Sequence, residues 1–276
     1  MINYNGNLIA ATDLQLNHEN RAFKYGDGIF ETIKIQKRRI VFWEDHYFRL
    51  MASMRMLRMK IPMEFTLEFL QEQILKVVET YDTSKILRAR MSVFRKDGGL
   101  YTPKTNEVDF IVEVKEVNLV AKEVYKVDLY KDFYNYSGLL STVKTTNRML
   151  NTLAAVFAEE NDLDNCLLLN ERKSVVEATN GNIFLIKGNT IKTPALTEGC
   201  IKGIARKKII EIITKNEDYT LEETTISPFE IQKADEVFIT NAIVGIQSVT
   251  NYRKKTFATT ITSKLKSSLN FLAITG

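Results

Sequence analysis

The spacing of apolar residues changes repeatedly along this chain, and that change constrains the fold more than any other sequence feature. Ile29, Ile33 and Ile35 stand an even number of residues apart in a β-branched run, which is typical of a strand with one buried face. Just downstream the spacing becomes three or four residues, as on the apolar side of a helix. The residues of that side are Trp43, Tyr47, Leu50, Met51, Met54 and Leu57. The chain is therefore expected to be neither all-α nor all-β but mixed.

The same reasoning divides the rest of the chain into further elements. Helical spacing predicts helices at 67–78, at 150–157, from about Gly203 onward, and at 261–269. Short β-rich runs predict strands at 87–94, 108–114, 166–169, 174–177, 182–186 and 237–240. We expect an α+β (mixed α/β) chain of two lobes, with an N-terminal α/β domain at 1–118 and a larger, β-rich C-terminal domain at 119–276. The linker is expected at about 116–126, where the sequence is charged.

Composition excludes several classes of function. The 276 residues carry a net charge of only +4, too little to predict nucleic-acid binding without a concentrated basic patch. No apolar run approaches the roughly 20 residues that span a bilayer, so we expect no membrane segment. The chain has two cysteines and two histidines, too few and too scattered to predict a disulfide framework or a metal centre. The N-terminal residues lack the pattern of a secretory signal, and we expect a cytoplasmic protein.

Two residues are candidates for chemistry because of where they stand. Lys144 ends the run LLSTVK, which has the composition of a strand, and burial there would make its amine nucleophilic toward carbonyl groups. Glu177 lies between two apolar runs and could pair with a buried cation or a protonated ring nitrogen. The alternatives are an exposed lysine and an ordinary glutamate at the end of a strand.

A second set of residues could bind an anion. Gly203 stands where a helix is predicted to start, so that the backbone N–H groups of Ile204 and Ala205 can approach a phosphate. Thr240 and Asn241 end a predicted strand and could add further donors to the same anion. Arg49 lies off the apolar side of its helix and could reach a phosphate; a solvated arginine and a plain turn glycine are the alternatives.

Six motifs, in order, span nearly the whole chain. They are RAFKYGDGIFETIKI (21–35), HYFRL (46–50), KTTNRML (144–150), VVEATNGNIFLIKGNTIKTP (175–194), GCIKGIAR (199–206) and ADEVFITNA (234–242). Together they resemble the motifs of the class IV (fold-type IV) pyridoxal-phosphate enzymes, a family that includes branched-chain aminotransferases, D-amino acid aminotransferases and aminodeoxychorismate lyases.

The resemblance implies a role for each candidate residue. Lys144 would hold pyridoxal 5'-phosphate through its amine and move the substrate's α-proton, and Glu177 would face the pyridine nitrogen. The phosphate would be held by Arg49, by the turn at Gly203 with the amides of Ile204 and Ala205, and by Thr240, with Asn241 a partner for the phosphate or a substrate carboxylate. The resemblance also implies a homodimer that acts on a small amino acid or an aminodeoxychorismate-like substrate.

The reaction is narrowed by short motifs. Met149 stands where branched-chain enzymes usually have tyrosine, and FRKDGGLYTP (94–103) lacks the R-x-H of D-amino acid enzymes. YGDGIFET, K-x-x-N-R and GG-x-Y resemble the aminodeoxychorismate lyase branch, which forms 4-aminobenzoate and pyruvate. The leading interpretation is therefore that lyase. The alternatives are a class IV aminotransferase of branched-chain or other amino acids, and a catalytically silent relative that binds the cofactor.

Overall fold

The computed structural model describes residues 1–119 and 122–275. Its contacts divide the chain into two compact units, Met1–Asn118 with Lys144–Asn147, and Leu119–Val143 with Arg148–Gly276. The linker expected at about 116–126 includes residues 120 and 121, which lie outside the described residues. Nothing in the sequence pattern predicted that Lys144–Asn147 return to the first unit.

The first unit is built on a six-stranded sheet with strand order β2-β1-β6-β5-β3-β4. Its elements are β1 (Ile2–Tyr4), β2 (Asn7–Ile9), η1 (Ala11–Asp13), α1 (Arg21–Tyr25), β3 (Gly28–Gln36), β4 (Arg39–Ile40), α2 (Trp43–Met56), α3 (Leu67–Val78), β5 (Leu87–Arg95) and β6 (Val108–Glu116). The long strands and helices confirm the elements expected from apolar spacing in this half of the chain.

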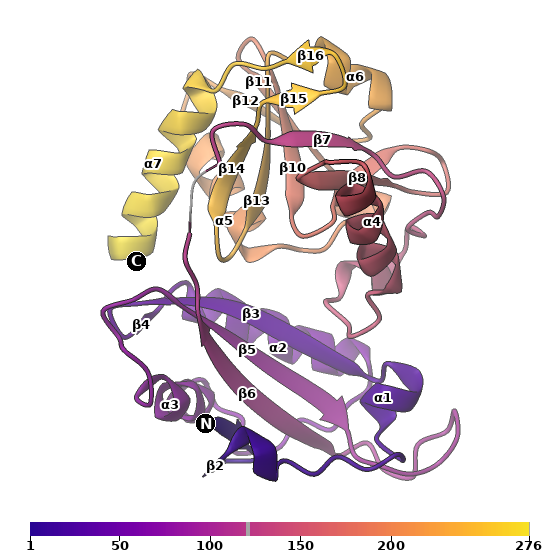
Figure 1. Ribbon diagram of the computed structural model, residues 1–276, viewed down its shortest axis with the longest axis vertical. Coiled ribbons are helices and arrows are strands. Elements are labelled where there is room, and N and C mark those ends of the chain that lie inside the picture. The colour runs from indigo at the N-terminus through magenta and orange to yellow at the C-terminus, as the bar shows by residue number, and fades with distance from the viewer. Residues whose placement is uncertain (120–121, 276) are drawn as a thin grey trace. The chain divides into compact units, whose positions relative to one another are not determined.

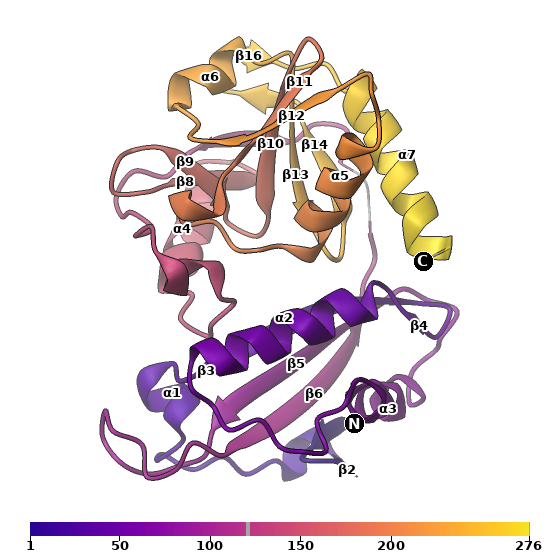
Figure 2. The same ribbon diagram turned by 180° about the vertical axis from the view of Figure 1, so that it is seen from behind.

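One face of this sheet forms the core because its strands alternate in phase. Ile33 of β3 pairs with Ala89 of β5, and Ile29 pairs with Val93, so that apolar side chains line up across the strands. The helices α2 and α3 cover this face, as Figure 2 shows, and Phe65 and Phe69 pack against Phe110 of β6.

The run before Lys144 is not a strand, and that expectation was wrong. Residues Leu139–Thr142 form the 3-10 turn η2. The hydroxyl of Ser141 donates to the Gly138 carbonyl at 2.6 Å and that of Thr142 to the Leu139 carbonyl at 2.7 Å. Such local bonds compete with strand pairing.

The second unit contains two five-stranded sheets, ordered β12-β11-β10-β13-β14 and β16-β15-β7-β8-β9 (Figure 1). Its elements are β7 (Lys126–Leu129), η2, α4 (Met149–Glu160), β8 (Asn165–Leu169), β9 (Val175–Ala178), β10 (Asn182–Lys187), β11 (Thr190–Pro194), η3 (Leu196–Glu198), α5 (Ile204–Thr214), β12 (Thr220–Thr224), α6 (Pro228–Lys233), β13 (Glu236–Asn241), β14 (Gly245–Val249), β15 (Asn251–Tyr252), β16 (Lys255–Thr256) and α7 (Thr260–Thr275).

The strand β8 shows why the strands of this unit have continuous apolar sequences rather than alternating apolar and polar residues. Leu167 and Leu169 point into a core shared by the two sheets. Cys166 and Leu168 point the other way and pack with Ala154 of α4. Both faces are therefore buried, which removes the need for polar residues at every second position.

Two helices complete the second unit on the sheet that contains β10. Phe184 of β10 stacks on Phe238 of β13 with ring centroids 4.8 Å apart. The helix α5 contacts β13, and α7, drawn in yellow in Figure 1, runs beside β14. Among the described residues, no helix combines the length and apolar character that crossing a membrane requires.

Candidate functional site

Glu177 is a buried carboxylate in the second unit. It lies on β9, 4% exposed, opposite Leu168 of β8. Its Oε2 accepts a hydrogen bond from the backbone N–H of Ile201 at 2.9 Å. An N–H donated to a carboxylate favours the anionic form, so the fold supplies Glu177 with a fixed donor in a place that water hardly reaches.

The helix α5 starts just after Ile201, the residue whose N–H donates to Glu177. Gly203 is the residue before the helix, and no side chain caps the helix there. A Cβ at Gly203 would stand 2.1 Å from Oδ1 of Asn182, so any other residue would force the buried Asn182 amide to move. The amide of Asn182 donates to the Ile201 carbonyl at 2.8 Å. The first turn of α5 thus offers backbone N–H groups and the positive end of the helix dipole.

Thr240 and Asn241 end the neighbouring strand β13, where Thr240 pairs with Asn182 of β10. The Thr240 hydroxyl donates to the Gly245 carbonyl at 2.7 Å, so a phosphate oxygen would compete for its single hydrogen. Oδ1 of Asn241 accepts from the N–H groups of Ile243 and Val244 and so shapes the turn. The second unit therefore brings Glu177, the start of α5 and Thr240 around Asn182.

Lys144 belongs to the first unit and is partly buried. Its carbonyl accepts from the N–H of Phe30 at 3.0 Å, and Thr145 forms a bridge with Ile29, so the lysine is fixed against the start of β3. Its amine lies 4.5 Å from the centroid of the Phe30 ring. An aromatic face next to an amine excludes water on that side and stabilises a positive charge.

Arg49, on the helix α2, is held by Glu31, a buried acid on the strand β3. Its Nε donates to Oε1 of Glu31 at 2.7 Å, and its Nη2 donates to Oε2, a two-point pairing that fixes the plane of the guanidinium group. Nδ1 of His46 lies 2.7 Å from Oε2 of the same carboxylate. Glu31 and His46 are 2% and 1% exposed, so this group of charges is removed from water.

The pKa values of this group follow from its geometry. Burial of Glu31 raises its pKa, but the charge of Arg49 and the hydrogen bonds of both partners outweigh burial and lower the pKa to about 2. Because an ionised carboxylate only accepts, Nδ1 of His46 is the donor. Nε2 of His46 is buried and has no hydrogen-bond partner among the described residues. Burial accordingly lowers the pKa of His46, which favours the neutral form of the imidazole in the folded protein.

Sequence reasoning missed candidate residues in each of the two units. Glu31 stands in the apolar row of β3 with Ile29 and Ile33, and an acid in such a row predicts a buried partner. His46 and Arg49 stand one helical turn apart on α2, so the sequence could have indicated both as partners of Glu31. Asn182, which links Ile201 to Gly203, has no comparable signal, because its role depends on a turn that meets it only in the folded unit.

Comparison with known proteins extends over both units. The sequence model of the family described as amino-transferase class IV matches residues 28–252. The aminodeoxychorismate lyase of Vibrio harveyi is 26% identical over 238 residues, which cover 83% of this chain and 84% of that protein. The D-alanine aminotransferase of Bacillus licheniformis is 24% identical over 266 residues, which cover 90% of this chain and 87% of that protein.

The fold has solved counterparts. The crystal structure of the branched-chain amino acid aminotransferase from Thermobaculum terrenum in its PLP form superposes with a TM-score of 0.86 at 19% identity, covering 99% of this chain and 93% of that one. The family match begins at the first residue of β3 and ends at the last residue of β15, so it takes in strands of both units. The fold-type IV architecture that the motifs implied is confirmed, and the chain belongs to the class IV aminotransferases.

Proposed function

We propose that this protein is a pyridoxal-phosphate enzyme that acts on an amino-group substrate, and that its leading reaction is 4-amino-4-deoxychorismate lyase. One observation carries the proposal. The second unit holds a buried acid, Glu177, next to a helix start that lacks a side-chain cap at Gly203, and the backbone of Ile201 and the amide of Asn182 connect the two.

These donors and acceptors fit the cofactor. Pyridoxal phosphate, when bound, supplies a protonated ring that accepts electrons from the substrate's α-carbon. Glu177 has the charge to accept a hydrogen bond from the ring N–H. The amides of Ile204 and Ala205 at the start of α5 have the direction and dipole to hold the phosphate, and Thr240 would add a hydroxyl by giving up its bond to Gly245.

The first unit contributes the amine and a second cation. Lys144 would hold the cofactor and then accept and return the proton of the substrate's α-carbon, a task suited to an amine partly shielded from water by Phe30. Arg49, oriented by Glu31, would donate to the phosphate as a planar guanidinium group. Asn241, the last residue of β13, would be a further partner for the phosphate or the substrate carboxylate.

Lyase and aminotransferase differ in what happens after proton removal. The lyase interpretation is supported by the YGDGIFET, K-x-x-N-R and GG-x-Y motifs and by the similarity to the Vibrio harveyi lyase. An aminotransferase is the second candidate, because the D-alanine aminotransferase of Bacillus licheniformis is similar over a larger share of this chain.

The experiment supplies the purified holoenzyme with one substrate at a time. We expect release of pyruvate and 4-aminobenzoate from aminodeoxychorismate, with no 2-oxo acid formed from amino acids. Formation of 2-oxo acid from an amino acid in the presence of an amino-group acceptor, with no aromatic product, would replace the lyase by the aminotransferase. Lys144→Ala should abolish both turnover and the visible absorbance of the bound cofactor, whereas Lys131→Ala, at an exposed lysine, should retain both. A wild-type protein that binds the cofactor but turns over nothing would favour the silent relative.

We further propose that the protein works as a cytoplasmic homodimer. We also propose that a linker at about residues 116–126 connects its two domains. The dimer is supported by an exposed apolar stripe on α4, formed by Met149, Leu153 and Val156, which are 72%, 36% and 46% exposed. Their spacing of four and three residues places them on one side of the helix. Contiguous exposed apolar surface is typical of protein interaction sites.

A further inference from the structure

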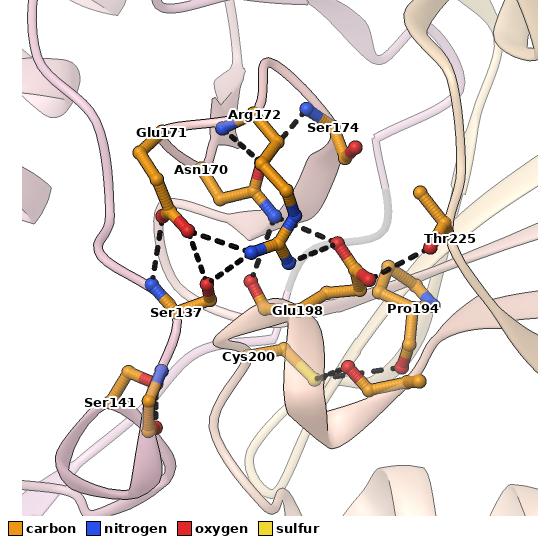
Figure 3. A network of polar contacts seen from close by, with 12 residues as sticks. Ser137, Ser141, Asn170, Glu171, Arg172, Ser174, Pro194, Glu198, Cys200 and Thr225 are labelled. Atoms are coloured by element: carbon orange, nitrogen blue, oxygen red, sulfur yellow. Dashed lines mark hydrogen bonds and ion pairs between the residues drawn. The ribbon is translucent and has the colours of Figure 1, made fainter.

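Glu198 is a buried acid that the proposed chemistry does not use. It ends η3 and is 7% exposed. Its Oε2 accepts from the Asn170 amide at 2.8 Å and from Arg172 at 3.0 Å, and its Oε1 accepts from the Thr225 hydroxyl at 2.8 Å (Figure 3). We call these four residues the Glu198 cluster. They come from three separate segments of the second unit, so the cluster ties those segments together.

The donors make the charge of Glu198 stable in this place. Burial raises the pKa of Glu198, but the hydrogen bonds from Thr225, Arg172 and Asn170 outweigh burial and leave the pKa below its ordinary value. An unpaired buried carboxylate would be costly, and hydrogen bonds to a charged group are among the strongest that proteins make. The cluster therefore anchors the three segments that meet at Glu198.

The anchor lies at one end of the strap, which we define as residues 199–203. Gly199 has a φ of +104°, which a residue with a side chain rarely adopts. Two residues further on, the Ile201 N–H donates to Glu177 at 2.9 Å and the Ile201 carbonyl accepts from Asn182 at 2.8 Å. The strap ends at Gly203, the residue before α5. The path of the strap therefore positions both the N–H group that donates to Glu177 and the first residue of α5.

The same anchor also holds the segment that runs into Lys144. Arg172 donates from Nη1 to the Ser137 hydroxyl at 2.8 Å (Figure 3). The amide of Asn135 donates to the Gly199 carbonyl at 2.8 Å, and the Lys202 N–H donates to the Thr142 carbonyl at 3.3 Å. Residues 135–142 are therefore fastened to the strap at both ends of the segment.

We propose that Glu198 is a positioning residue for the pyridoxal-phosphate chemistry, because its cluster fixes both the strap that gives Glu177 its N–H donor and the segment that leads into Lys144. This inference rests on the proposed function. Loosening the strap withdraws the Ile201 N–H from Glu177, which makes the anion of that acid less favourable and weakens its hold on the protonated ring. Glu198 acts through the backbone and touches neither cofactor nor substrate.

The test compares Glu198→Gln with a matched control, Glu236→Gln. Glu236 is another buried acid of the same unit, 3% exposed, and its two oxygens accept the N–H groups of Ile261 and Thr262 at 2.8 Å at the start of α7. We expect both variants to lower the melting temperature. Only Glu198→Gln should move the pH titration of the bound cofactor's visible absorbance, by at least about half a unit. Only Glu198→Gln should lower kcat, about tenfold, with KM nearly unchanged.

A second measurement does not need the cofactor. In the cofactor-free protein, Glu198→Gln should speed amide hydrogen exchange in the strap and in residues 135–142, whereas Glu236→Gln should do so at the start of α7. A wild-type protein that binds no pyridoxal phosphate would refute the proposed function. Faster exchange in Glu198→Gln would still show, in that case, that the cluster positions the strap. A titration and kcat equal to wild type in a cofactor-binding protein would overturn the inference. If Glu198→Gln does not fold, Thr225→Val, which removes one donor, should give a smaller shift of the titration in the same direction.

Discussion

At the scale of single residues, the buried group around Glu31 combines a permanent ion pair with a histidine that cannot accept a second proton cheaply. The carboxylate of Glu31 is satisfied by Arg49 and by Nδ1 of His46. Protonation of His46 would place a new N–H where the described residues offer no acceptor. Loss of one partner of such a buried pair typically costs about 3–5 kcal/mol. Arg49 therefore owes its orientation to residues that never need to touch a ligand.

This group predicts an acid-sensitive first unit. The folded pKa of His46 lies below its unfolded value, so between those two values the unfolded chain binds more protons and stability falls as the pH falls. Glu31, with a folded pKa of about 2, remains charged above pH 5.5. We expect the urea midpoint to be lower at pH 5.5 than at pH 7.5, and the difference to shrink in His46→Gln. His18→Gln, at an exposed histidine, is the control and should keep the wild-type difference.

At the scale of elements, the start of α5 depends on the absence of a side chain. In Gly203→Ala the new Cβ would stand 2.1 Å from Oδ1 of the buried Asn182. Moving that amide breaks its bond to Ile201, so we expect a loss of stability of about 1–3 kcal/mol and an affinity for pyridoxal phosphate at least about tenfold weaker. Calorimetric titration of the cofactor-free protein measures the affinity. Gly138→Ala, whose Cβ would meet nothing within 4 Å, should bind the cofactor like wild type.

Apolar spacing was sufficient for the elements that bury a face and insufficient for the others. The elements β3, α2, α3 and β5 lie where the sequence predicted them, because core packing demands the period that the pattern shows. The edge strand β12 was not predicted, since its residues are mostly exposed and no apolar alternation marks them. The turn η2 was wrongly predicted as a strand because that prediction took Leu139 and Leu140 for core residues. They are 73% and 63% exposed and do not pack into the core.

The candidate site was predictable in part for the same reason. Gly203 and the residues of α5 form a local signal, a glycine in front of a helix, that sequence alone conveys. The pairing of Glu177 with Ile201 and the cluster around Glu198 join segments that are far apart in the chain, and no local pattern encodes such contacts.

At the scale of the whole molecule, the apolar stripe on α4 makes the oligomeric state testable. Val156→Asp places a charge among Met149 and Leu153, and burying that charge in an interface without a partner is costly. We expect wild type to sediment as a dimer and Val156→Asp as a monomer. Phe229→Asp changes another exposed apolar residue of the same unit, on α6, and should remain dimeric. A Val156→Asp protein that is folded and still dimeric would contradict the assignment of this surface.

The return of Lys144–Asn147 to the first unit has a consequence for how the protein is made. When the ribosome has released the first 118 residues, the strand β3 still lacks the stretch that pairs with its beginning. That stretch arrives only after part of the second unit has been translated. The N-terminal half therefore cannot finish folding in the order of synthesis, and a gene truncated after residue 118 would encode a product with an open edge at the start of β3.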